Sequence, residues 1–313
     1  MKVLRRLEEV RLRRRAISIG VFDGVHRGHM RILETLRAVR KDEDLESGLL
    51  LSFHPHPLAL LRPESPPRMI CTLDERIALL AELGIDELLV LDFTPELAAT
   101  VFDAFAREVL VGCLGMKHLV AGYDFRMGRG RGGSAVDMAA LGEREGFRVD
   151  VVTPYYLDGE IISSTRIRAA VEAADMEAAR VRLGRPFSLS GRVVSGKGLG
   201  RELGFPTANL ESFPAEKLLP PSGVYRVKVR KDGRSYDGLM NLGNAPTLRD
   251  RFMAELHLLD FQGDLYGASL KVDVIQWLRG EEKFHGFEDL HDAIAADVSE
   301  LLSILEKEDR ESR

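Results

Sequence analysis

The first half of the chain alternates short apolar runs with amphipathic stretches. The apolar runs cover residues 16–22, 48–54, 86–93, 118–125 and 147–155. Runs of this length, rich in Val, Leu, Ile and Phe, predict buried β-strands. Because helical stretches separate them, we expect a mostly parallel sheet with helices on both faces. Ligands of such sheets bind beyond the carboxyl ends of the strands.

Helix boundaries in this half are marked by capping residues. Apolar positions recur with helical period over residues 26–40. Thr72 and Glu75 have the spacing of a capping box, and Thr94 before a proline marks another helix start. The stretch 164–183 predicts one further helix. Together these signals predict an α/β domain of the Rossmann-like kind.

The second half changes to strand periodicity. Residues 187–194, 224–229 and 255–261 read as strands, and Lys-Asp-Gly at 231–233 is a hairpin signal. Helical periodicity returns only at Phe287. The inner face of this terminal helix is apolar and consists of Leu290, Ile294, Val298 and Leu301. We expect an antiparallel β-barrel closed by the helix.

The change of pattern predicts two domains, over residues 1–183 and 184–313. The length of 313 residues agrees, since one domain takes about 150. With 45% hydrophobic and 30% charged residues, the chain has the composition of a soluble globular protein. No apolar run approaches the ~18 residues of a membrane span. The first 15 residues carry seven bases, two acids and no apolar core, so we expect a solvated lead-in and no secretory signal.

The net charge and the cysteine content argue against several classes of protein. The 49 acidic and 44 basic residues give a formal charge of -5, which argues against non-specific binding to nucleic acid or anionic membranes. Cys71 and Cys113 lie far apart and lack the spacing of a zinc site. A disulfide framework is therefore excluded, and we expect a cytoplasmic protein.

The main candidate for chemistry is the segment 18–29, SIGVFDGVHRGH. It runs from a buried strand through a glycine turn into a helix start, where backbone amides attract phosphate. His26 and His29 are three positions apart, so on a helix they share one face. Two imidazoles there suit the negative charge of a phosphorus group in transfer. A metal pair, which lacks a third nearby ligand, and a packed histidine are the alternatives.

Two further segments of this half carry phosphate-binding chemistry. Residues 163–168, SSTRIR, begin a helix with hydroxyl caps and two arginines, and a merely capped helix is the alternative. Residues 122–133, GYDFRMGRGRGG, form either a clamp over a phosphorylated substrate or a flexible solvated loop. In FHPHP at 53–57 the prolines predict only an extended turn.

The second half offers a different set of groups. Residues 191–198, GRVVSGKG, narrowly miss the P-loop pattern, because glycine replaces the hydroxyl residue that would hold magnesium. We therefore expect an open glycine loop that wraps phosphates with its amides. Thr207 and Asn209 would face one side of an extended segment and offer oxygens to a hard cation. Glu255 and His257 lie on the polar face of their strand, opposite its apolar face. For a glutamate in such a position, plain exposure to solvent is the usual explanation.

At this point the motifs resemble a known family. GVFDGVHRGH, FHPHP, GYDFRMG and SSTRIR, in this order, are similar to the nucleotidyltransferase domain of the bacterial bifunctional riboflavin kinase/FMN adenylyltransferases, also called FAD synthetases. GKGLGRELGFPTANL, PPSGVYRV, NLGNAPT, AELHLLDFQGDLYG and LRGEEKF resemble the riboflavin kinase domain of the same family. The resemblance covers nearly the whole chain, except the lead-in and the tail after about residue 305.

The resemblance implies two successive reactions and a six-stranded barrel in the second domain. ATP would phosphorylate riboflavin to FMN there, with Mg²⁺ at Thr207 and Asn209 and with Glu255 as the base. The N-terminal domain would adenylylate FMN to FAD, with His26 and His29 in catalysis. It would bind ATP and FMN through Gly20, Phe22, Asp23, Gly24, His56, Asp124, Arg126, Ser164, Thr165 and Arg168. The C-terminal domain would bind ATP and flavin through Gly196, Lys197, Gly198, Gly200, Gly204, Pro206, Asn241, Thr247, Arg279 and Glu281.

Two positions depart from the family pattern, and two rival functions stay open. Leu248 stands where an aromatic residue is common, and Ala293 where Gln is common. One rival is an enzyme with a single working domain. The other is a non-catalytic flavin- or nucleic-acid-binding protein, which only the arginine loop at 126–131 supports. We expect riboflavin, FMN and ATP as partners, no nucleic acid, no membrane, and a monomer or weak homo-oligomer.

Overall fold

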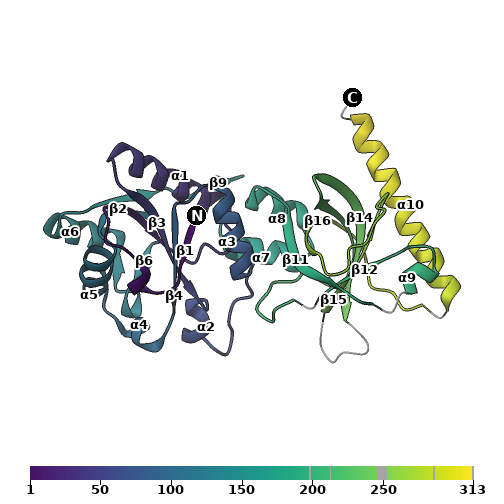
Figure 1. Cartoon of the computed structure of the whole chain (residues 1–313), viewed down its shortest axis with the longest axis horizontal. Helices are drawn as coiled ribbons and strands as arrows, with labels where there is room; N and C mark the ends of the chain where they lie inside the picture. Colours follow the sequence, from purple (N-terminus) through teal and green to yellow (C-terminus); the bar gives the residue numbers. More distant parts are fainter. Residues whose placement is uncertain (197–198, 212, 245–251, 285, 312–313) are drawn as a thin grey trace. The chain divides into compact units, whose positions relative to one another are not determined.

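The computed structural model describes residues 1–196, 199–211, 213–244, 252–284 and 286–311. The chain divides into two compact units, Met1–Arg166 and Ile167–Arg313. Figure 1 shows a sheet with surrounding helices in the first unit, and a barrel with one long helix in the second.

The first unit is built on a parallel sheet with the strand order β1-β4-β3-β2-β5-β8. Its strands are β1 (Lys2–Leu4), β2 (Arg15–Ile19), β3 (Ser47–His54), β4 (Glu87–Asp92), β5 (Met116–Gly122) and β8 (Arg148–Val152). The chain runs from β2 through β3 to β4 on one side, and from β5 to β8 on the other. The order therefore reverses beside β2, which is where a ligand crevice forms in such sheets.

Helices cover both faces of this sheet, as expected. α1 (Arg27–Asp42) buries Leu33 and Leu36 and contacts β2, β3, β5 and β8. A separate core cluster joins Ile17 and Leu49 of the strands to helices that follow β4 and β5. The remaining helices are η1 (Leu7–Glu9), α2 (Pro57–Leu61), α3 (Leu73–Glu82), α4 (Pro95–Ala99), α5 (Phe102–Ala104), η2 (Phe105–Cys113), η3 (Arg129–Arg131) and α6 (Ala135–Glu145). Two small antiparallel pairs complete the unit, β6 (Arg126–Met127) with β7 (Gly133–Ser134) and β9 (Tyr156–Leu157) with β10 (Glu160–Ile161).

The predicted helix caps are confirmed. The Thr72 hydroxyl accepts from the Glu75 amide at 3.2 Å, and the Glu75 carboxylate accepts from the Thr72 amide at 2.9 Å. Thr94 caps α4 by accepting from the Leu97 amide at 3.3 Å. A second capping box at Ser134 begins α6. Each bond satisfies an amide that the first helical turn leaves without a partner.

A buried ion pair joins three strands of the sheet. Nε of Arg15 donates to Oε2 of Glu87 at 2.8 Å, and the Ser47 hydroxyl donates to the same oxygen at 2.7 Å. The carbonyl of Leu114 accepts a further bond from Arg15 at 2.8 Å. Burial acts to raise the pKa of Glu87, but the bonds from Arg15 and Ser47 outweigh it and hold the pKa below its usual value.

Two sequence-based expectations for this part of the chain were wrong. The lead-in is not simply solvated, because Lys2–Leu4 pairs with β4 as strand β1 and Leu4 is buried. The single helix expected over 164–183 is two helices, α7 (Ser164–Glu172) and α8 (Met176–Leu183). Between them Ala174 has a left-handed φ of 57°, and the Asp175 carboxylate caps α8 at the Ala178 amide.

The second unit contains the expected closed antiparallel barrel, with the strand order β11-β12-β15-β14-β13-β16. Its strands are β11 (Phe187–Val194), β12 (Ala208–Leu210), β13 (Gly223–Lys231), β14 (Arg234–Asn244), β15 (Phe252–Leu258) and β16 (Ser269–Gly280). The predicted hairpin turn joins β13 to β14, with positive φ at Asp232 and Gly233. That pair of angles matches the twist of the strands it connects.

Two helices accompany the barrel, α9 (Leu199–Glu202) and the long α10 (Phe287–Glu311). α10 packs on the barrel through Leu301, which is fully buried. Two guanidinium groups hold it further: buried Arg226 pairs with Glu308 at 2.5 and 2.7 Å, and partly buried Arg279 pairs with Asp297 at 2.7 and 2.8 Å. Bidentate pairs of this kind fix orientation as well as distance.

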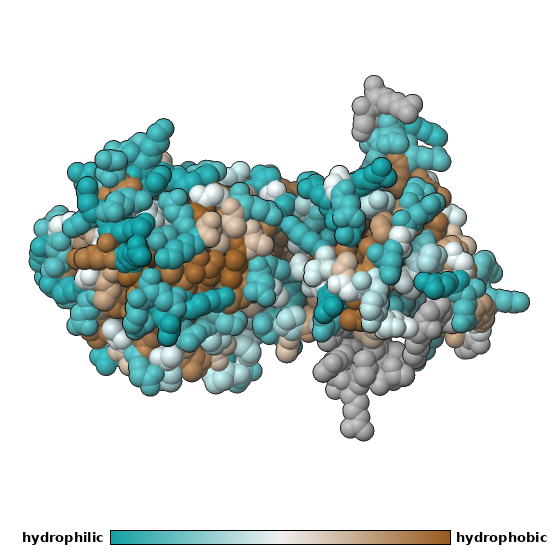
Figure 2. Space-filling view, in the orientation of Figure 1, coloured by the Kyte–Doolittle hydropathy of each residue, from teal (hydrophilic) through white to brown (hydrophobic). Residues whose placement is uncertain are grey.

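The visible surface is mainly hydrophilic, with hydrophobic residues in patches between polar ones (Figure 2). The large exposed apolar side chains of the described residues include Val136 and Leu12 in the first unit and Tyr266 in the second. Among the described residues, no helix combines the length and the apolar character needed to cross a membrane.

Candidate functional site

The first candidate site lies where the strand order of the parallel sheet reverses. β2 ends at Ile19, and residues 20–26 lead from its carboxyl end into α1. The N-terminus of α1, with the positive end of its dipole, therefore lies at the carboxyl edge of the sheet. This is the position that the sequence predicts for phosphate chemistry.

His26 and His29 lie together at this helix start. Their rings are stacked, with centroids 3.6 Å apart and an interplanar angle of 15°. His26 precedes the helix as its N-cap, and its Nδ1 accepts from the His29 amide at 3.3 Å. A neutral His26 ring that accepts at Nδ1 carries its proton on Nε2. Within the described residues, no group of three or more His, Cys, Asp and Glu side chains could hold a metal ion.

The loop before the histidines has an unusual backbone. Phe22 and Val25 have positive φ values of 54° and 40°, and Gly24 has a φ of 80°. Non-glycine residues in this region cost energy, and they persist where the surroundings fix them. Phe22 is buried and its ring lies edge-on to that of His29, with centroids 5.3 Å apart. A Cβ at Gly20 would lie 3.4 Å from the Phe22 ring, which is an ordinary contact distance.

Asp23 acts mainly on the backbone in this structure. Its two carboxylate oxygens accept from the amides of Ile70 and Cys71, both at 3.1 Å. Its carbonyl accepts from the hydroxyl of Ser164 at 3.0 Å. Ser164 begins α7, so these bonds tie the loop after β2 to two distant segments of the same unit.

Arg76 is a functional candidate that the sequence analysis missed. Its side chain is buried, and it donates to the carbonyl of Val21 and, at 3.4 Å, to that of Phe53. Burial lowers the pKa of Arg76, while the charge of Asp23 acts in the opposite direction. Arg76 thus joins the loop after β2 to the end of β3. An arginine inside an amphipathic helix carries no sequence signal for such a role.

The other residues expected in this half lie on several segments. His56 caps α2, since its Nδ1 accepts from the Leu58 amide at 3.0 Å. Thr165 is exposed in the first turn of α7, and Arg168 follows one turn later in the same helix. The structure brings Ser164 to the histidine loop through Asp23.

The glycine and arginine segment 122–133 contains a short hairpin, in which β6 pairs with β7. Arg126 is exposed in β6. A Cβ at Gly128 or Gly133 would overlap Phe102, so both glycines allow the hairpin to pack on that residue. Asp124 is exposed after β5. Burial and the neighbouring charge of Asp124 raise the pKa of Tyr123 above its ordinary value of 10.

The second candidate site is a row of polar side chains on the outer face of the barrel. The register pairs Asn209 of β12 with Glu255 of β15, and Glu255 with Asn241 of β14. Ala254 and Leu256 are buried, so Glu255 lies on the opposite, outer face as its strand pattern predicts. Side chains opposite one another on antiparallel strands have Cβ atoms about 5 Å apart.

A glycine segment packs onto one end of this row. A Cβ at Gly196 would overlap the side-chain amide of Asn209, and one at Gly200 would lie 2.8 Å from Oγ1 of Thr207. Only glycine allows the backbone to approach both polar groups so closely. The hydroxyl of Thr207 and the side-chain amide of Asn209 thus lie against the backbone of Gly200 and Gly196. These hard oxygen donors fit Mg²⁺, which binds few protein ligands together with phosphates and water.

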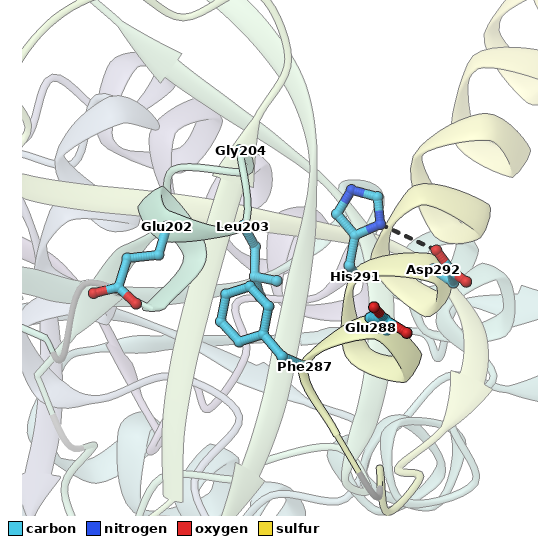
Figure 3. A pocket seen from close by; sticks show the side chains of 7 residues that line it. All are labelled: Glu202, Leu203, Gly204, Phe287, Glu288, His291 and Asp292. Carbon is cyan, nitrogen blue, oxygen red and sulfur yellow. Dashed lines mark hydrogen bonds and ion pairs between the residues drawn. The ribbon is translucent and has the colours of Figure 1, made fainter.

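A cavity of about 500 Å³ lies beside the same segment. Figure 3 shows its lining side chains coming from α9 and the turn after it, and from the first turns of α10. They are Glu202, Leu203, Gly204, Phe287, Glu288, His291 and Asp292. Next to the cavity, the ring of Phe205 lies between those of His291 and His257, at centroid distances of 5.6 and 5.7 Å. The sequence analysis did not assign this cavity, because its two sides are about 85 residues apart.

The remaining expected residues of this half lie in several places. Arg279 is held by Asp297, whose hydrogen bonds raise the pKa of Arg279, and Glu281 lies against Gly243. Gly204 and Pro206 lie in the turn between α9 and β12. Lys197, Gly198, Thr247 and the departure Leu248 lie outside the described residues. The departure Ala293 lies in α10 and is partly buried.

Comparisons with known proteins cover both halves of the chain. Residues 8–166 match the family model described as FAD synthetase, and residues 183–305 match the model described as riboflavin kinase. A bifunctional riboflavin kinase/FMN adenylyltransferase of Pseudomonas fluorescens is 39% identical over 303 residues, 96% of each chain. The protein of the same name from Escherichia coli K12 is 37% identical over 283 residues, 90% of each chain.

A solved structure shares the arrangement of elements over the whole chain. It is the crystal structure of a protein from Streptococcus pneumoniae that is named a macrolide-efflux protein. Its TM-score is 0.85 at 27% identity, with 96% of this chain and 98% of that chain covered. The similarity supports the fold of both units, and the name concerns the activity of that protein alone.

Proposed function

The chain belongs to the family of bifunctional riboflavin kinase/FMN adenylyltransferases, and on this premise we propose which of its residues carry each reaction. Its substrates are riboflavin, FMN and ATP. The C-terminal half transfers the γ-phosphoryl group of ATP to riboflavin and gives FMN and ADP. The N-terminal half joins FMN to the AMP part of a second ATP and gives FAD and pyrophosphate.

For FAD formation we assign the chemistry to the histidine pair at the start of α1. An FMN phosphate oxygen attacks the α-phosphorus of ATP, and the bond to the pyrophosphate leaving group breaks. A phosphate is already ionised near neutral pH, so this attack needs no general base. His26 and His29 stabilise the charge that develops on the transferred group, together with the amides of the helix N-terminus. The stacked rings at the crevice support this assignment.

Other groups would position the substrates of this reaction. Ser164, Thr165 and Arg168 hold ATP phosphates from α7, where hydroxyls and a guanidinium follow one another at the helix start. Asp124 and Arg126, both exposed after β5, contact ATP or FMN. The backbone of Gly20, Phe22 and Gly24 lines the phosphate path, and Asp23 keeps that loop in place.

For FMN formation we assign the base to Glu255. Its carboxylate takes the proton of the ribityl 5′-hydroxyl as that oxygen attacks the γ-phosphorus in line, and ADP leaves. Thr207 and Asn209 would hold Mg²⁺, which neutralises phosphate charge when it is bound. Asn241 lies beside Glu255 on the third strand of the row, where its amide can bind a substrate hydroxyl. The common face of these residues supports the assignment.

The flavin ring system would occupy the cavity beside Phe205. A volume of about 500 Å³ is in the range of small-molecule pockets, and Leu203, Phe287 and the ring of His291 offer apolar and aromatic contact. Because Phe205 also touches His257, the cavity lies near the strand that carries Glu255. Arg279, Glu281 and the glycine backbone of residues 196–204 would complete the binding of ATP and flavin.

The finer aspects of organisation are also proposals. We place the domain boundary between residues 183 and 184, which is supported by the start of the riboflavin kinase match at residue 183. Division by contacts falls earlier, at residues 166 and 167. We propose a cytoplasmic monomer or weak homo-oligomer without nucleic-acid or membrane partners, in keeping with its formal charge of -5.

The observation that carries the kinase assignment is the row of Asn209, Glu255 and Asn241. A direct assay incubates the purified protein with riboflavin, Mg²⁺ and ATP and separates the flavins by chromatography. We expect FMN to form first and FAD to follow. FMN that accumulates without FAD, or no FMN at all, would mean that only one half works.

A further inference from the structure

His257 makes a hydrogen bond that links the strand of the candidate base to the segment of the candidate metal ligands. Its Nδ1 lies 3.0 Å from the carbonyl oxygen of Pro206. A carbonyl only accepts, so His257 donates from a protonated Nδ1.

The bond falls at the end of a short strand. In the register of β12 with β15, Ala208 pairs with Leu256 and Asn209 pairs with Glu255. β12 begins at Ala208, so Pro206 and Thr207 lie just before the backbone ladder. The His257 side chain therefore anchors the chain at Pro206, the residue before Thr207, which the backbone hydrogen bonds between β12 and β15 do not reach.

Ring contacts reinforce the same anchor. The rings of Phe205 and His257 meet edge-to-face, with centroids 5.7 Å apart and an interplanar angle of 88°. Such pairs stabilise one relative orientation. His257 thus contacts both residues that precede Thr207, namely Phe205 and Pro206. His257 itself is partly buried on the outer face of β15.

We propose that His257 is a positioning residue of the kinase site. By holding the Pro206 carbonyl, it sets Thr207 and Asn209 in register with Glu255, so that the bound Mg-ATP faces the base. This inference rests on the proposed assignment of Thr207 and Asn209 to Mg-ATP. A side chain that orients those two residues affects the binding of Mg-ATP equally in the ground state and in the transition state of phosphoryl transfer. Its loss therefore changes KM more than kcat.

Three substitutions of His257 separate the effect of its hydrogen-bond donor from that of its aromatic ring. His257→Phe keeps a ring for Phe205 and loses the donor. His257→Asn loses the ring but keeps an amide nitrogen as many bonds from the backbone as Nδ1. His257→Leu has the branched shape of Asn but carries neither a donor nor a ring, and it replaces the Phe variant if that protein does not fold. Tyr236→Leu is the matched control, because it removes another edge-to-face pair of the barrel, that with Phe261 at 5.2 Å.

The measurement is the KM for Mg-ATP and the kcat of FMN formation in the full chain. FMN adenylylation on the same preparation serves as the internal reference for enzyme concentration. The fluorescence of Trp277, the one tryptophan in the sequence, reports whether the barrel is folded. We expect His257→Phe to raise KM about tenfold with kcat changed less than about threefold, and His257→Asn to restore KM to within about threefold of the wild type. Tyr236→Leu should change neither.

The outcomes distinguish this inference from the site assignment on which it rests. Thr207→Ala measured in parallel tests the assignment itself, which fails if the KM for Mg-ATP stays at the wild-type value. If Thr207→Ala raises that KM while folded His257→Phe or His257→Leu does not, the inference about His257 is overturned. A His257→Asn variant no better than His257→Phe would also overturn it, because the donor would then be irrelevant.

Discussion

Asn209 and Glu255 are direct cross-strand partners on the outer face of the barrel, through the register of β12 and β15. Side chains of a strand alternate between its faces, so a slip of one residue would turn one of the two inward. Strand pairing thus fixes the candidate metal ligand relative to the candidate base. The close packing of Gly196 on Asn209 makes that glycine a sensitive position.

Gly196→Ala should impair the kinase half selectively. The new Cβ overlaps the Asn209 amide, which has to move, and we expect kcat/KM for FMN formation to fall by about tenfold or more. FMN adenylylation should be unchanged in the same preparation. Gly191→Ala on β11 is the control, because its Cβ would meet no described atom closer than 3.4 Å. Equal rates of FMN formation in both variants would contradict the packing argument.

Arg76→Met should impair the other half selectively. Without the guanidinium, the carbonyls of Val21 and Phe53 lose their common donor, and the loop before His26 loses its link to β3. We expect FMN adenylylation to fall about 10- to 100-fold, the size of effect that a small misplacement produces, while FMN formation is retained. Arg76→Lys should lie in between, since one ammonium group cannot span both carbonyls. Full adenylylation by a folded Met variant would refute the role.

Glu87→Gln tests the buried pair with Arg15 through its pH dependence. The folded pKa of Glu87 lies below its ordinary 4.5, so the pair stabilises the fold above pH 4.5. This stabilisation is lost as the pH falls through the folded value. We expect the variant to be about 3 kcal/mol less stable near neutral pH, with a weaker loss of stability in acid. Urea unfolding followed by circular dichroism across this range measures both effects, and parallel acid curves for the two proteins would contradict the assignment.

Arg279 pairs with a protein carboxylate in the structure, but the sequence analysis expects it to contact a bound ligand. Its bidentate bond to Asp297 holds α10, whereas the family resemblance implies a ligand contact. If the pair is structural, Arg279→Lys and Asp297→Asn should each destabilise the barrel half, with a coupling of about 1–3 kcal/mol in a double-mutant cycle. A rise in KM for riboflavin or ATP in Arg279→Lys alone, at unchanged stability, would instead favour direct ligand contact.

Local patterns predicted much of this molecule. Strand and helix periods indicated both architectures, and the capping box at Thr72 and the hairpin at 231–233 are where the sequence placed them. These features depend on neighbouring residues. The break of the helix at Ala174 did not follow from composition, because alanine favours helix and only its left-handed φ ends it there.

Features formed by segments distant in the chain could not be predicted from the sequence. Nothing near Arg76 indicates that it reaches the carbonyls of Val21 and Phe53, and strand β1 is too short to show a period. The cavity joins α9 to α10, and the contact of His257 with Pro206 joins positions 51 residues apart. Such contacts depend on strand register and packing, which a single sequence does not reveal.

The central claim is that each half holds its own phosphate-transfer site, and two variants assayed by flavin chromatography test it most directly. We predict that His29→Ala forms FMN from riboflavin at the wild-type rate but no FAD. Glu255→Gln should form no FMN from riboflavin, yet convert supplied FMN to FAD at the wild-type rate. Loss of both activities in either variant, with the protein folded, would contradict the assignment of one reaction to each half.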